Sequence, residues 1–230
     1  MIASAEKLTE KSGIHIGLIP DGNRRYATKN GKMPWEGHLN GTEKMKDFLK
    51  WCLEGKDVNE VSVYALSTEN LKRGKEELNY LWKIYTAELS NLLADPTIKK
   101  NDVKVNIVGD SSLWIPEVKD LVEKVTKATE QHKTRKLNIL LAYGAQFEIN
   151  SIFHNLNGHR PKSIDEMLMV KEPLDLLIRT GGQRRMSNFL LYQSAYAELY
   201  FTDTLWPEFS KQEFQKAVDW YWEQQKNFGK

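Results

Sequence analysis

The chain has 230 residues, 40% of them hydrophobic and 28% charged, which fits one large globular domain or two small ones and excludes a disordered or fibrous chain. Its formal net charge is only +2, so no overall positive field points to a nucleic acid partner. The single cysteine, Cys52, excludes an internal disulfide and a cysteine-only metal site, and favours a reducing compartment.

Residues 1–13 are polar and charged, unlike a secretory signal peptide. No apolar run in the chain reaches the length of a transmembrane helix. We therefore expect a cytoplasmic protein in which residues 1–13 form a polar N-terminal extension of the folded domain.

The first expected element is a buried strand over residues 14–19, which Pro20 ends. Five residues of polar or flexible character follow at once: Asp21, Gly22, Asn23, Arg24 and Arg25. Backbone N–H groups and arginines suit phosphate oxygens, and a carboxylate suits a hard cation such as Mg²⁺. The alternative interpretation is an ordinary Asp-Gly turn with solvated arginines.

The rest of the chain alternates between short apolar runs and amphipathic stretches. The expected further strands cover residues 61–66, 103–108, 137–142, 174–178 and 197–201. The expected helices cover residues 35–54, 76–93, 112–132, 147–156, 164–170 and 209–228, and residues 72–75 form a charged, mobile linker. This alternation predicts an α/β fold with a mostly parallel, six-stranded sheet flanked by helices.

Parallel strands end at one edge of a sheet, so four polar segments are expected to meet there: residues 21–23, 67–70, 109–110 and 179–182. The last of them opens a second basic cluster, in which a Gly-Gly turn precedes arginines and Ser187. Alone, this cluster could equally be a basic surface loop. Two anion sites with acids between them indicate a divalent cation. The chain has no Gly-x-x-x-x-Gly-Lys motif, which argues against nucleotide-triphosphate chemistry.

Three features have a structural and a functional interpretation. His38, after Gly37, is either a structural hydrogen-bonding group or part of a site. Glu198 lies inside an apolar run and needs a metal or an arginine as its partner. The apolar stripe of residues 76–93 either faces the core or forms one wall of an apolar tunnel.

Together these residues resemble the cis-prenyltransferase family, of the undecaprenyl diphosphate synthase type. The resemblance runs from His15 to Gly229 and is carried by residues 15–23, 37–38, 64–70, 109–110, 175–182, 185–190, 195–201 and 205–207. It implies a single domain over residues 1–230, with an apolar tunnel between the sheet and its helices. Enzymes of this family join isopentenyl diphosphate to an allylic diphosphate, forming a new Z double bond with the help of Mg²⁺.

The resemblance implies a role for each candidate residue. Asp21 would handle Mg²⁺ and the leaving diphosphate, and Glu198 would support the metal-bearing side. The residues expected to hold the allylic diphosphate are Gly22, Asn23 and Arg25, with His38 next to it. The residues expected to bind isopentenyl diphosphate are Arg179, Arg185 and Ser187.

Two further groups follow from the same resemblance. The proton that leaves would lie near Ser67, Asn70 and Asn23. Arg73 and Glu77 would lie on a mobile loop that covers the site. The resemblance also implies a homodimer that contacts a membrane peripherally to release its product.

The chain also departs from the family pattern. Pro34 stands where family members commonly carry an arginine on the allylic side, and Arg24 stands where many have glycine. Our hypothesis is that Arg24 partly compensates for the missing arginine. Further departures are Tyr26, Leu71 and Gln183, which leave the substrate range and product length open. An inward-pointing Trp82 or Tyr85 would shorten the product channel.

Two alternative functions remain at this stage. One is a non-catalytic partner subunit of such an enzyme, against which the presence of both diphosphate-binding clusters argues. The other is an α/β protein that binds a sugar phosphate or a nucleotide, which only the generic strand edge supports.

Overall fold

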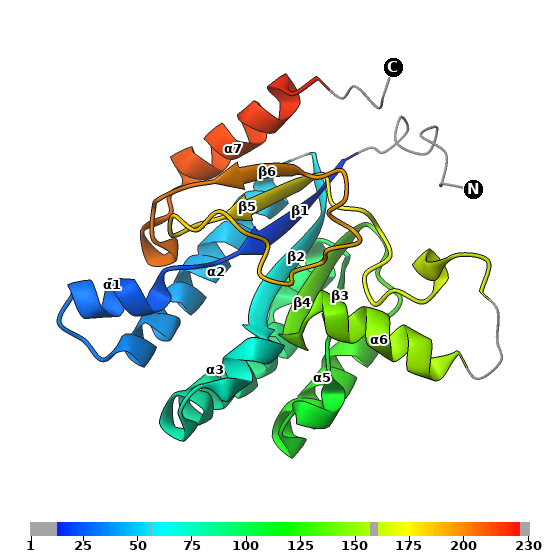
Figure 1. Ribbon diagram of the computed structural model, residues 1–230, viewed down its shortest axis with the longest axis horizontal. Coiled ribbons are helices and arrows are strands. Elements are labelled where there is room, and N and C mark those ends of the chain that lie inside the picture. Colours follow the sequence, from blue (N-terminus) through cyan, green and yellow to red (C-terminus); the bar gives the residue numbers. More distant parts are fainter. Residues whose placement is uncertain (1–12, 56, 157–160, 226–230) are drawn as a thin grey trace.

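One parallel sheet organises the part of the chain that the computed structural model describes, residues 13–55, 57–156 and 161–225 (Figure 1). Its strands are β1 (Ile14–Ile19), β2 (Val58–Ser67), β3 (Val103–Val108), β4 (Arg135–Tyr143), β5 (Leu176–Arg179) and β6 (Glu198–Phe201). They lie in the order β3-β4-β2-β1-β5-β6, and every neighbouring pair is parallel. The predicted α/β fold with a six-stranded parallel sheet is therefore confirmed.

The strand order reverses at β1, which has β2 on one side and β5 on the other. At such a switch point, the connections that leave neighbouring strands diverge and open a crevice beyond the carboxyl ends. The register places Ile19 of β1 beside Arg179 of β5 at that end of the sheet. The fold thus brings the two polar segments that follow β1 and β5 to the two sides of one crevice.

Each face of the sheet packs against its own hydrophobic core. Ile16 and Leu18 point into one core, because side chains alternate between faces along a strand. Four helices cover that core: α2 (Gly37–Glu54), α3 (Lys75–Ala94), α5 (Pro116–Thr129) and α7 (Lys211–Glu223). Ile19 points into the other core, which α6 (Ala145–Asn155) and the segments around Leu174 and Phe189 cover. Burial of these apolar side chains is the main driving force for the layered fold.

Two short helices were not predicted from the hydrophobic periodicity of the sequence. Helix α1 (Asn23–Lys29) buries only Ala27 among its seven residues, so no apolar periodicity marks it. Helix α4 (Pro96–Lys100) has five residues and begins after Asp95, whose side chain accepts a hydrogen bond from Thr97 N. Helix α4 thus has a side-chain cap, whereas α1 follows Gly22, which makes no side-chain cap hydrogen bond.

Several predicted boundaries are wrong. The helix expected from Ser112 begins at Pro116, because Asp110 caps a separate 3₁₀ turn over Ser111–Leu113. The helix expected over residues 164–170 is only a 3₁₀ turn, Ile164–Glu166. The expected linker over residues 72–75 is instead the junction between a 3₁₀ turn and α3, where the side chain of Arg73 is hydrogen-bonded. Most of the predicted polar extension, residues 1–12, and the predicted helix end at residues 226–228 lie outside the described residues.

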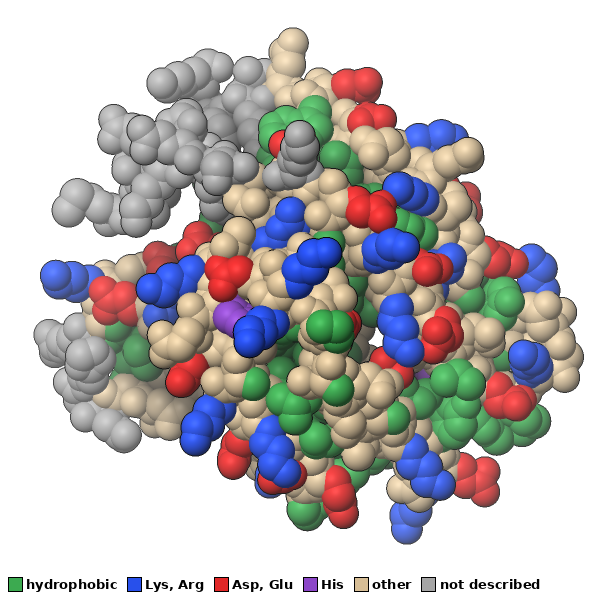
Figure 2. Space-filling model, turned by 180° about the vertical axis from the view of Figure 1, so that it is seen from behind, with side chains coloured by type: hydrophobic (Ala, Val, Ile, Leu, Met, Phe, Trp, Pro, Cys, Tyr) green, Lys and Arg blue, Asp and Glu red, His purple; other side chains and the backbone are tan. Residues whose placement is uncertain are grey.

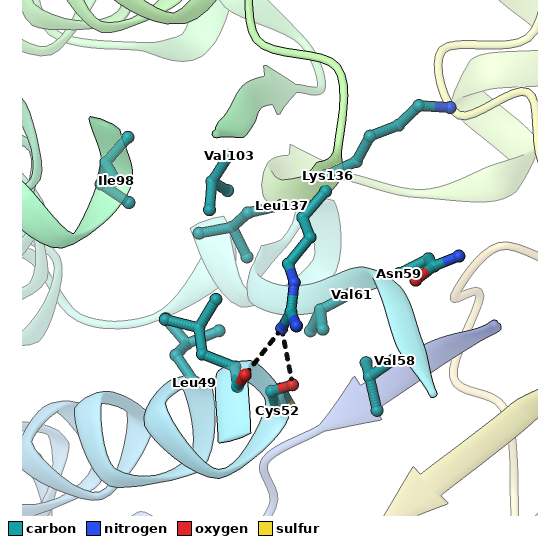
Figure 3. A pocket seen from close by; sticks show the side chains of 11 residues that line it. Leu49, Cys52, Val58, Asn59, Val61, Ile98, Val103, Lys136 and Leu137 are labelled. Carbon is teal, nitrogen blue, oxygen red and sulfur yellow. Dashed lines mark hydrogen bonds between the residues drawn. The ribbon is translucent and has the colours of Figure 1, made fainter. Parts of the chain in front are cut away.

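A small apolar cavity of about 50 Å³ lies at the amino ends of β2, β3 and β4, the opposite end of the sheet from the crevice. Figure 3 shows Leu49, Val61 and Leu137 among the side chains that line it. Arg135 borders it and donates hydrogen bonds to the carbonyl oxygens of Cys52 and Leu53, at the end of α2. The apolar tunnel expected between the sheet and its helices stays a prediction.

The surface seen in Figure 2 carries Lys and Arg side chains interspersed with Asp and Glu. Over the described ranges, no helix is both long enough and apolar enough to cross a bilayer. Four exposed apolar side chains lie on β6, an edge strand of the sheet, or in the segment that precedes it in the sequence: Leu191, Tyr192, Tyr196 and Leu199.

Candidate active site

A cleft of about 730 Å³ lies beyond the carboxyl ends of β1, β2 and β5. Twelve residues singled out from the sequence line it: Asp21, Gly22, Asn23, Arg24, Arg25, His38, Ser67, Asn70, Arg73, Arg179, Arg185 and Ser187. Its volume is typical of sites that bind small molecules. The segments after β1, β2 and β5 therefore meet as predicted. Gly109 and Asp110 do not join them, because β3 lies at the far edge of the sheet.

Asp21 connects the two basic clusters. Its Oδ1 atom accepts a hydrogen bond from Arg25 at 3.0 Å, and its Oδ2 atom accepts one from Arg179 at 2.9 Å. Arg25 lies four residues after Asp21, on α1, and Arg179 is the last residue of β5. One carboxylate, about a third exposed, thus faces a guanidinium from each side of the cleft. An anion that displaced this carboxylate from either arginine would meet a charged, two-pronged donor.

Arg179 is the most deeply buried cation of the cleft, with only 4% of its side chain exposed. Besides Asp21, it donates hydrogen bonds to Ser187 Oγ at 2.7 Å and to the carbonyl oxygen of Arg185. Its Nε atom is buried and has no hydrogen-bond partner among the described residues. Arg179 is therefore held by neighbours on two sides and keeps one buried donor that no described residue satisfies.

The Gly-Gly turn lets the two clusters approach each other. Gly181 has a left-handed backbone with φ of 79°, and a Cβ atom there would lie 2.5 Å from Arg25. It would also lie 2.8 Å from the carbonyl oxygen of Asp21. A side chain at this position would be strained and would push the arginine of α1 away from the Asp21 carboxylate.

A buried carboxylate organises the other wall of the cleft. Glu77 Oε1 lies 2.9 Å from Arg73, 3.1 Å from His38 Nε2 and 3.9 Å from Arg24 Nε. Glu77 itself is buried and does not line the cleft, although the sequence placed it at the substrate. From beneath the cleft lining, Glu77 is hydrogen-bonded to the guanidinium of Arg73 and the imidazole of His38, which do line the cleft.

His38 is held as a neutral imidazole. Burial lowers its pKa below the usual value of 6.5, the hydrogen bond with Glu77 opposes that shift, and the charges of Arg73 and Arg24 add to it. A neutral imidazole can donate or accept a hydrogen bond without adding charge to the cleft.

The amide and hydroxyl groups predicted near the departing proton lie together at the end of β2. Ser67 Oγ accepts a hydrogen bond from Asn70 N at 3.2 Å, and Asn70 Oδ1 accepts one from Arg73 at 3.0 Å. Asn23 enters the cleft from α1, and its buried Oδ1 atom has no partner among the described residues. That atom packs against Gly41 of α2, where a Cβ atom would lie 2.3 Å from it.

Glu198 is not brought to the cleft, and the expectation that it shares a metal with Asp21 is wrong for residues of one chain. Glu198 begins β6 level with Leu176, whereas Phe201, at the other end of β6, is level with Arg179. The three-residue separation corresponds to roughly 10 Å along a strand, on the side away from Asp21. Glu198 is the second residue of the predicted strand 197–201, so a parallel sheet already places it toward the amino end; only the resemblance placed it beside Asp21.

The residues of the cleft fit a magnesium ion only with help from a ligand. No group of three or more His, Cys, Asp or Glu side chains comes together among the described residues to hold a metal. Mg²⁺ is commonly bound through one or two carboxylates together with phosphate oxygens and water. Asp21, between Arg25 and Arg179, suits that pattern.

Sequence reasoning assigned no role at the site to Tyr64, because an aromatic side chain in an apolar stretch looks like ordinary core. Tyr64 donates hydrogen bonds to the carbonyl oxygens of Tyr143 and Ser187, at 3.1 and 3.3 Å. Tyr85, considered only for product length, donates one to Ala65 O at 2.6 Å. Burial raises the pKa of both cleft tyrosines, Tyr64 and Tyr85, so both remain protonated donors.

The fold and this cleft define an α/β protein with two arginine clusters at a strand switch point. Residues 19–229 match the prenyltransferase family model described as "Putative undecaprenyl diphosphate synthase". The chain belongs to this family, the cis-prenyltransferases, whose members are prenyl-transferring enzymes.

Two relatives illustrate the similarity in sequence. The geranylgeranyl-diphosphate-specific tritrans,polycis-undecaprenyl-diphosphate synthase of Pyrococcus horikoshii is 39% identical over 96% of this chain and 89% of its own length. The enzyme of the same name from Methanopyrus kandleri is 41% identical over 94% of this chain and 84% of its own.

Two crystal structures illustrate the similarity in fold. Lavandulyl diphosphate synthase from Lavandula x intermedia, in complex with dimethylallyl diphosphate, has a TM-score of 0.85 and 26% identity over 96% of this chain and all of its own. A probable undecaprenyl diphosphate synthase from Campylobacter jejuni has a TM-score of 0.77 and 28% identity, and the match covers 94% of this chain and 98% of that one.

Proposed function

We propose that the protein elongates prenyl chains in the cis configuration, by condensing isopentenyl diphosphate with an allylic prenyl diphosphate. The observation that carries the proposal is the Asp21 carboxylate, which pairs with Arg25 on one side of the cleft and Arg179 on the other. A cleft with two separate cationic clusters suits two diphosphates better than one. Because the relatives from Pyrococcus and Methanopyrus are named for geranylgeranyl diphosphate, that is the allylic primer to test first.

In the proposed reaction, the allylic C–O bond breaks and diphosphate leaves with the bonding electrons. The C=C electrons of isopentenyl diphosphate form the new C–C bond, and loss of a proton restores a double bond, now Z. Negative charge grows on the leaving oxygens, so donors placed around them lower the barrier. Mg²⁺, held by Asp21 and diphosphate oxygens, would supply electrostatic stabilisation of that charge.

The proposed roles follow the two sides of the cleft. On the α1 side, Gly22, Asn23 and Arg25 hold the allylic diphosphate, with Arg24, His38 and Arg73 beside it. On the β5 side, Arg179, Arg185 and Ser187 hold isopentenyl diphosphate. At the end of β2, the polar groups of Ser67, Asn70 and Asn23 lie where the proton would depart.

We further propose that the growing chain extends along the sheet, beneath α2 and α3, toward the apolar cavity of Figure 3. Leu81 and Tyr85 of α3 line the cleft, and Leu49 and Cys52 of α2 line the cavity, so the same helix layer borders both. Opening of the side chains between them would create a dry channel for an isoprenoid.

A homodimer and peripheral contact with a membrane complete the proposal. The exposed tyrosines and leucines near β6 suit a second copy of the chain, because an edge strand also offers unpaired backbone groups. A long isoprenoid product is apolar enough to leave the cleft for a bilayer, and a cytoplasmic enzyme at the membrane surface could deliver it there.

The test is incubation with labelled isopentenyl diphosphate, geranylgeranyl diphosphate and Mg²⁺. We expect butanol-extractable product whose formation needs all three. If no allylic primer gives product, the enzyme proposal fails. Product that forms only after a second polypeptide is added would favour a partner subunit. Binding of sugar phosphates or nucleotides without any prenyl transfer would favour the third alternative.

A further inference from the structure

The segment after Arg185 contains three non-glycine residues with left-handed backbones: Ser187, Asn188 and Leu190, with φ of 48°, 63° and 35°. Side chains rarely adopt this conformation, and it persists where surrounding contacts impose it. Ser187 is exposed, yet its Oγ atom receives the 2.7 Å hydrogen bond from Arg179. Something other than burial must therefore hold Ser187 in place.

Asn188 makes three contacts that could do so, none of them to a cleft residue. Its side-chain Nδ2 donates to Glu69 Oε1 at 2.9 Å, in the 3₁₀ turn that follows β2. Its Oδ1 accepts from Gln146 N at 2.9 Å, and its carbonyl oxygen accepts from Ala145 N at 2.8 Å. These N–H groups belong to the first turn of α6, which no adjacent side chain caps.

We propose that Asn188 is a positioning residue, which holds Ser187 against Arg179 by tying its segment to Glu69 and to the start of α6. The inference rests on the proposed diphosphate site, since it concerns how that site keeps its shape. Asn188 tolerates the left-handed backbone better than most residues. It also carries both the donor that Glu69 needs and the acceptor that α6 needs. Aspartate at this position would keep the oxygen that accepts from α6. It would replace the NH₂ group that donates to Glu69 with a carboxylate oxygen, so that two carboxylates would face each other.

The loss of this donor in Asn188→Asp can be tested directly. In Asn188→Asp, two carboxylates face each other, so we expect KM for isopentenyl diphosphate to rise about three- to tenfold. KM for the allylic primer should change less than twofold. In the double variant Asn188→Asp with Glu69→Gln, the glutamine donates to the aspartate. KM for isopentenyl diphosphate should then return close to the wild-type value. The matched control is Asn91→Asp, because Asn91 donates to Glu88 on the exposed side of α3, away from the cleft.

A further comparison separates positioning from general structural support. If Asn188 acts through Ser187, then Asn188→Asp should add little to the effect of Ser187→Ala in a double-mutant cycle. Additive effects, or equal loss for both substrates without recovery in the Glu69→Gln background, would overturn the proposal. Should Asn188→Asp not fold, Asn188→Gly keeps the backbone conformation accessible and removes the side chain. An Asn188→Gly variant with wild-type KM would equally overturn it.

Titration with inorganic diphosphate keeps this inference distinct from the proposed function. If the wild-type protein makes no prenyl product, the proposed function fails. The positioning role is then judged by the dissociation constant for diphosphate. A three- to tenfold weaker constant in Asn188→Asp, restored in the double variant, supports the role, and an unchanged constant contradicts it.

Discussion

Arg179 lies 2.9 Å from Asp21, a residue 158 positions earlier in the chain, and this contact connects the two clusters of the cleft. It exists because β1 and β5 are neighbours in the sheet, with Ile19 and Arg179 in register at their carboxyl ends. Two segments that each resemble an ordinary polar turn thereby become the two sides of one site.

Replacement of Arg179 by lysine should weaken binding of isopentenyl diphosphate. Lysine keeps the charge but cannot reach Asp21 and Ser187 at the same time as the planar guanidinium does. We expect KM for isopentenyl diphosphate to rise about tenfold or more, with a smaller change for the allylic primer. Steady-state kinetics with each substrate varied in turn measures this difference. A larger effect on the allylic KM would reverse the assignment of the two sides.

Replacement of Arg24 by glycine tests whether this residue compensates for Pro34. Both residues line the cleft, and Arg24 lies 3.9 Å from Glu77. We expect KM for the allylic primer to rise about three- to tenfold, because a partly exposed cation near a diphosphate is removed. Addition of Pro34→Arg should restore it.

The control for this change is Lys29→Ala, which removes an exposed cation of the same helix outside the cleft lining. Unchanged KM and kcat in Arg24→Gly would show that the hypothesis of compensation is wrong.

Replacement of Trp82 by alanine should lengthen the product. Trp82 is 9% exposed and packs edge-to-face on Tyr85, a lining residue, with ring centroids 6.0 Å apart. Its removal would give the growing chain more room. The fold should lose about 3–5 kcal/mol of stability, so products must be compared well below the unfolding temperature. Chromatography of dephosphorylated products measures the length, and Trp222→Ala, at an exposed site of α7, is the control. An unchanged product distribution would contradict a channel along α3.

The stability of the protein should fall as the pH drops below about 6.5, in part because of His38. Burial lowers the pKa of His38 in the folded state, so in this range the unfolded chain takes up a proton that the folded chain resists. His38→Gln should flatten the dependence of unfolding free energy on pH between about 7.5 and 5.5. Urea unfolding at several pH values measures it, with His154→Gln on the exposed side of α6 as control. An identical slope in His38→Gln and the wild type would show that His38 is not the source.

Much of the fold follows from the sequence, because buried parallel strands and amphipathic helices leave strong periodic signals. The ends of β1, β2 and β5 could be assigned to one edge on topology alone, and most of the cleft follows from that. Helix α1 could not be predicted, since its residues bury a single side chain. Tyr64 could not be distinguished from core residues, since an aromatic side chain in an apolar run gives no sign of what it faces.

The error at Glu198 has a different reason. Glu198 is the second residue of its predicted strand, so the parallel topology already places it at the amino end, and the expectation of a shared metal came from the resemblance alone. The pairing of Glu198 with Leu176 agrees with the topology. The position of Glu77 could not be predicted either. Whether its side chain reaches the cleft depends on how α3 is rotated against β2, and the sequence does not determine that rotation.

The most direct test of the account compares the wild-type protein with Asp21→Ala, using labelled isopentenyl diphosphate, geranylgeranyl diphosphate and Mg²⁺. We expect the wild type to form products that grow by whole isoprene units with Z double bonds, seen by mass spectrometry and carbon-13 NMR. We expect Asp21→Ala to stay folded and lose at least about a hundredfold in kcat, because it loses the carboxylate that serves both sides of the cleft. Wild-type turnover that persists in Asp21→Ala, or products with only E double bonds, would contradict the account.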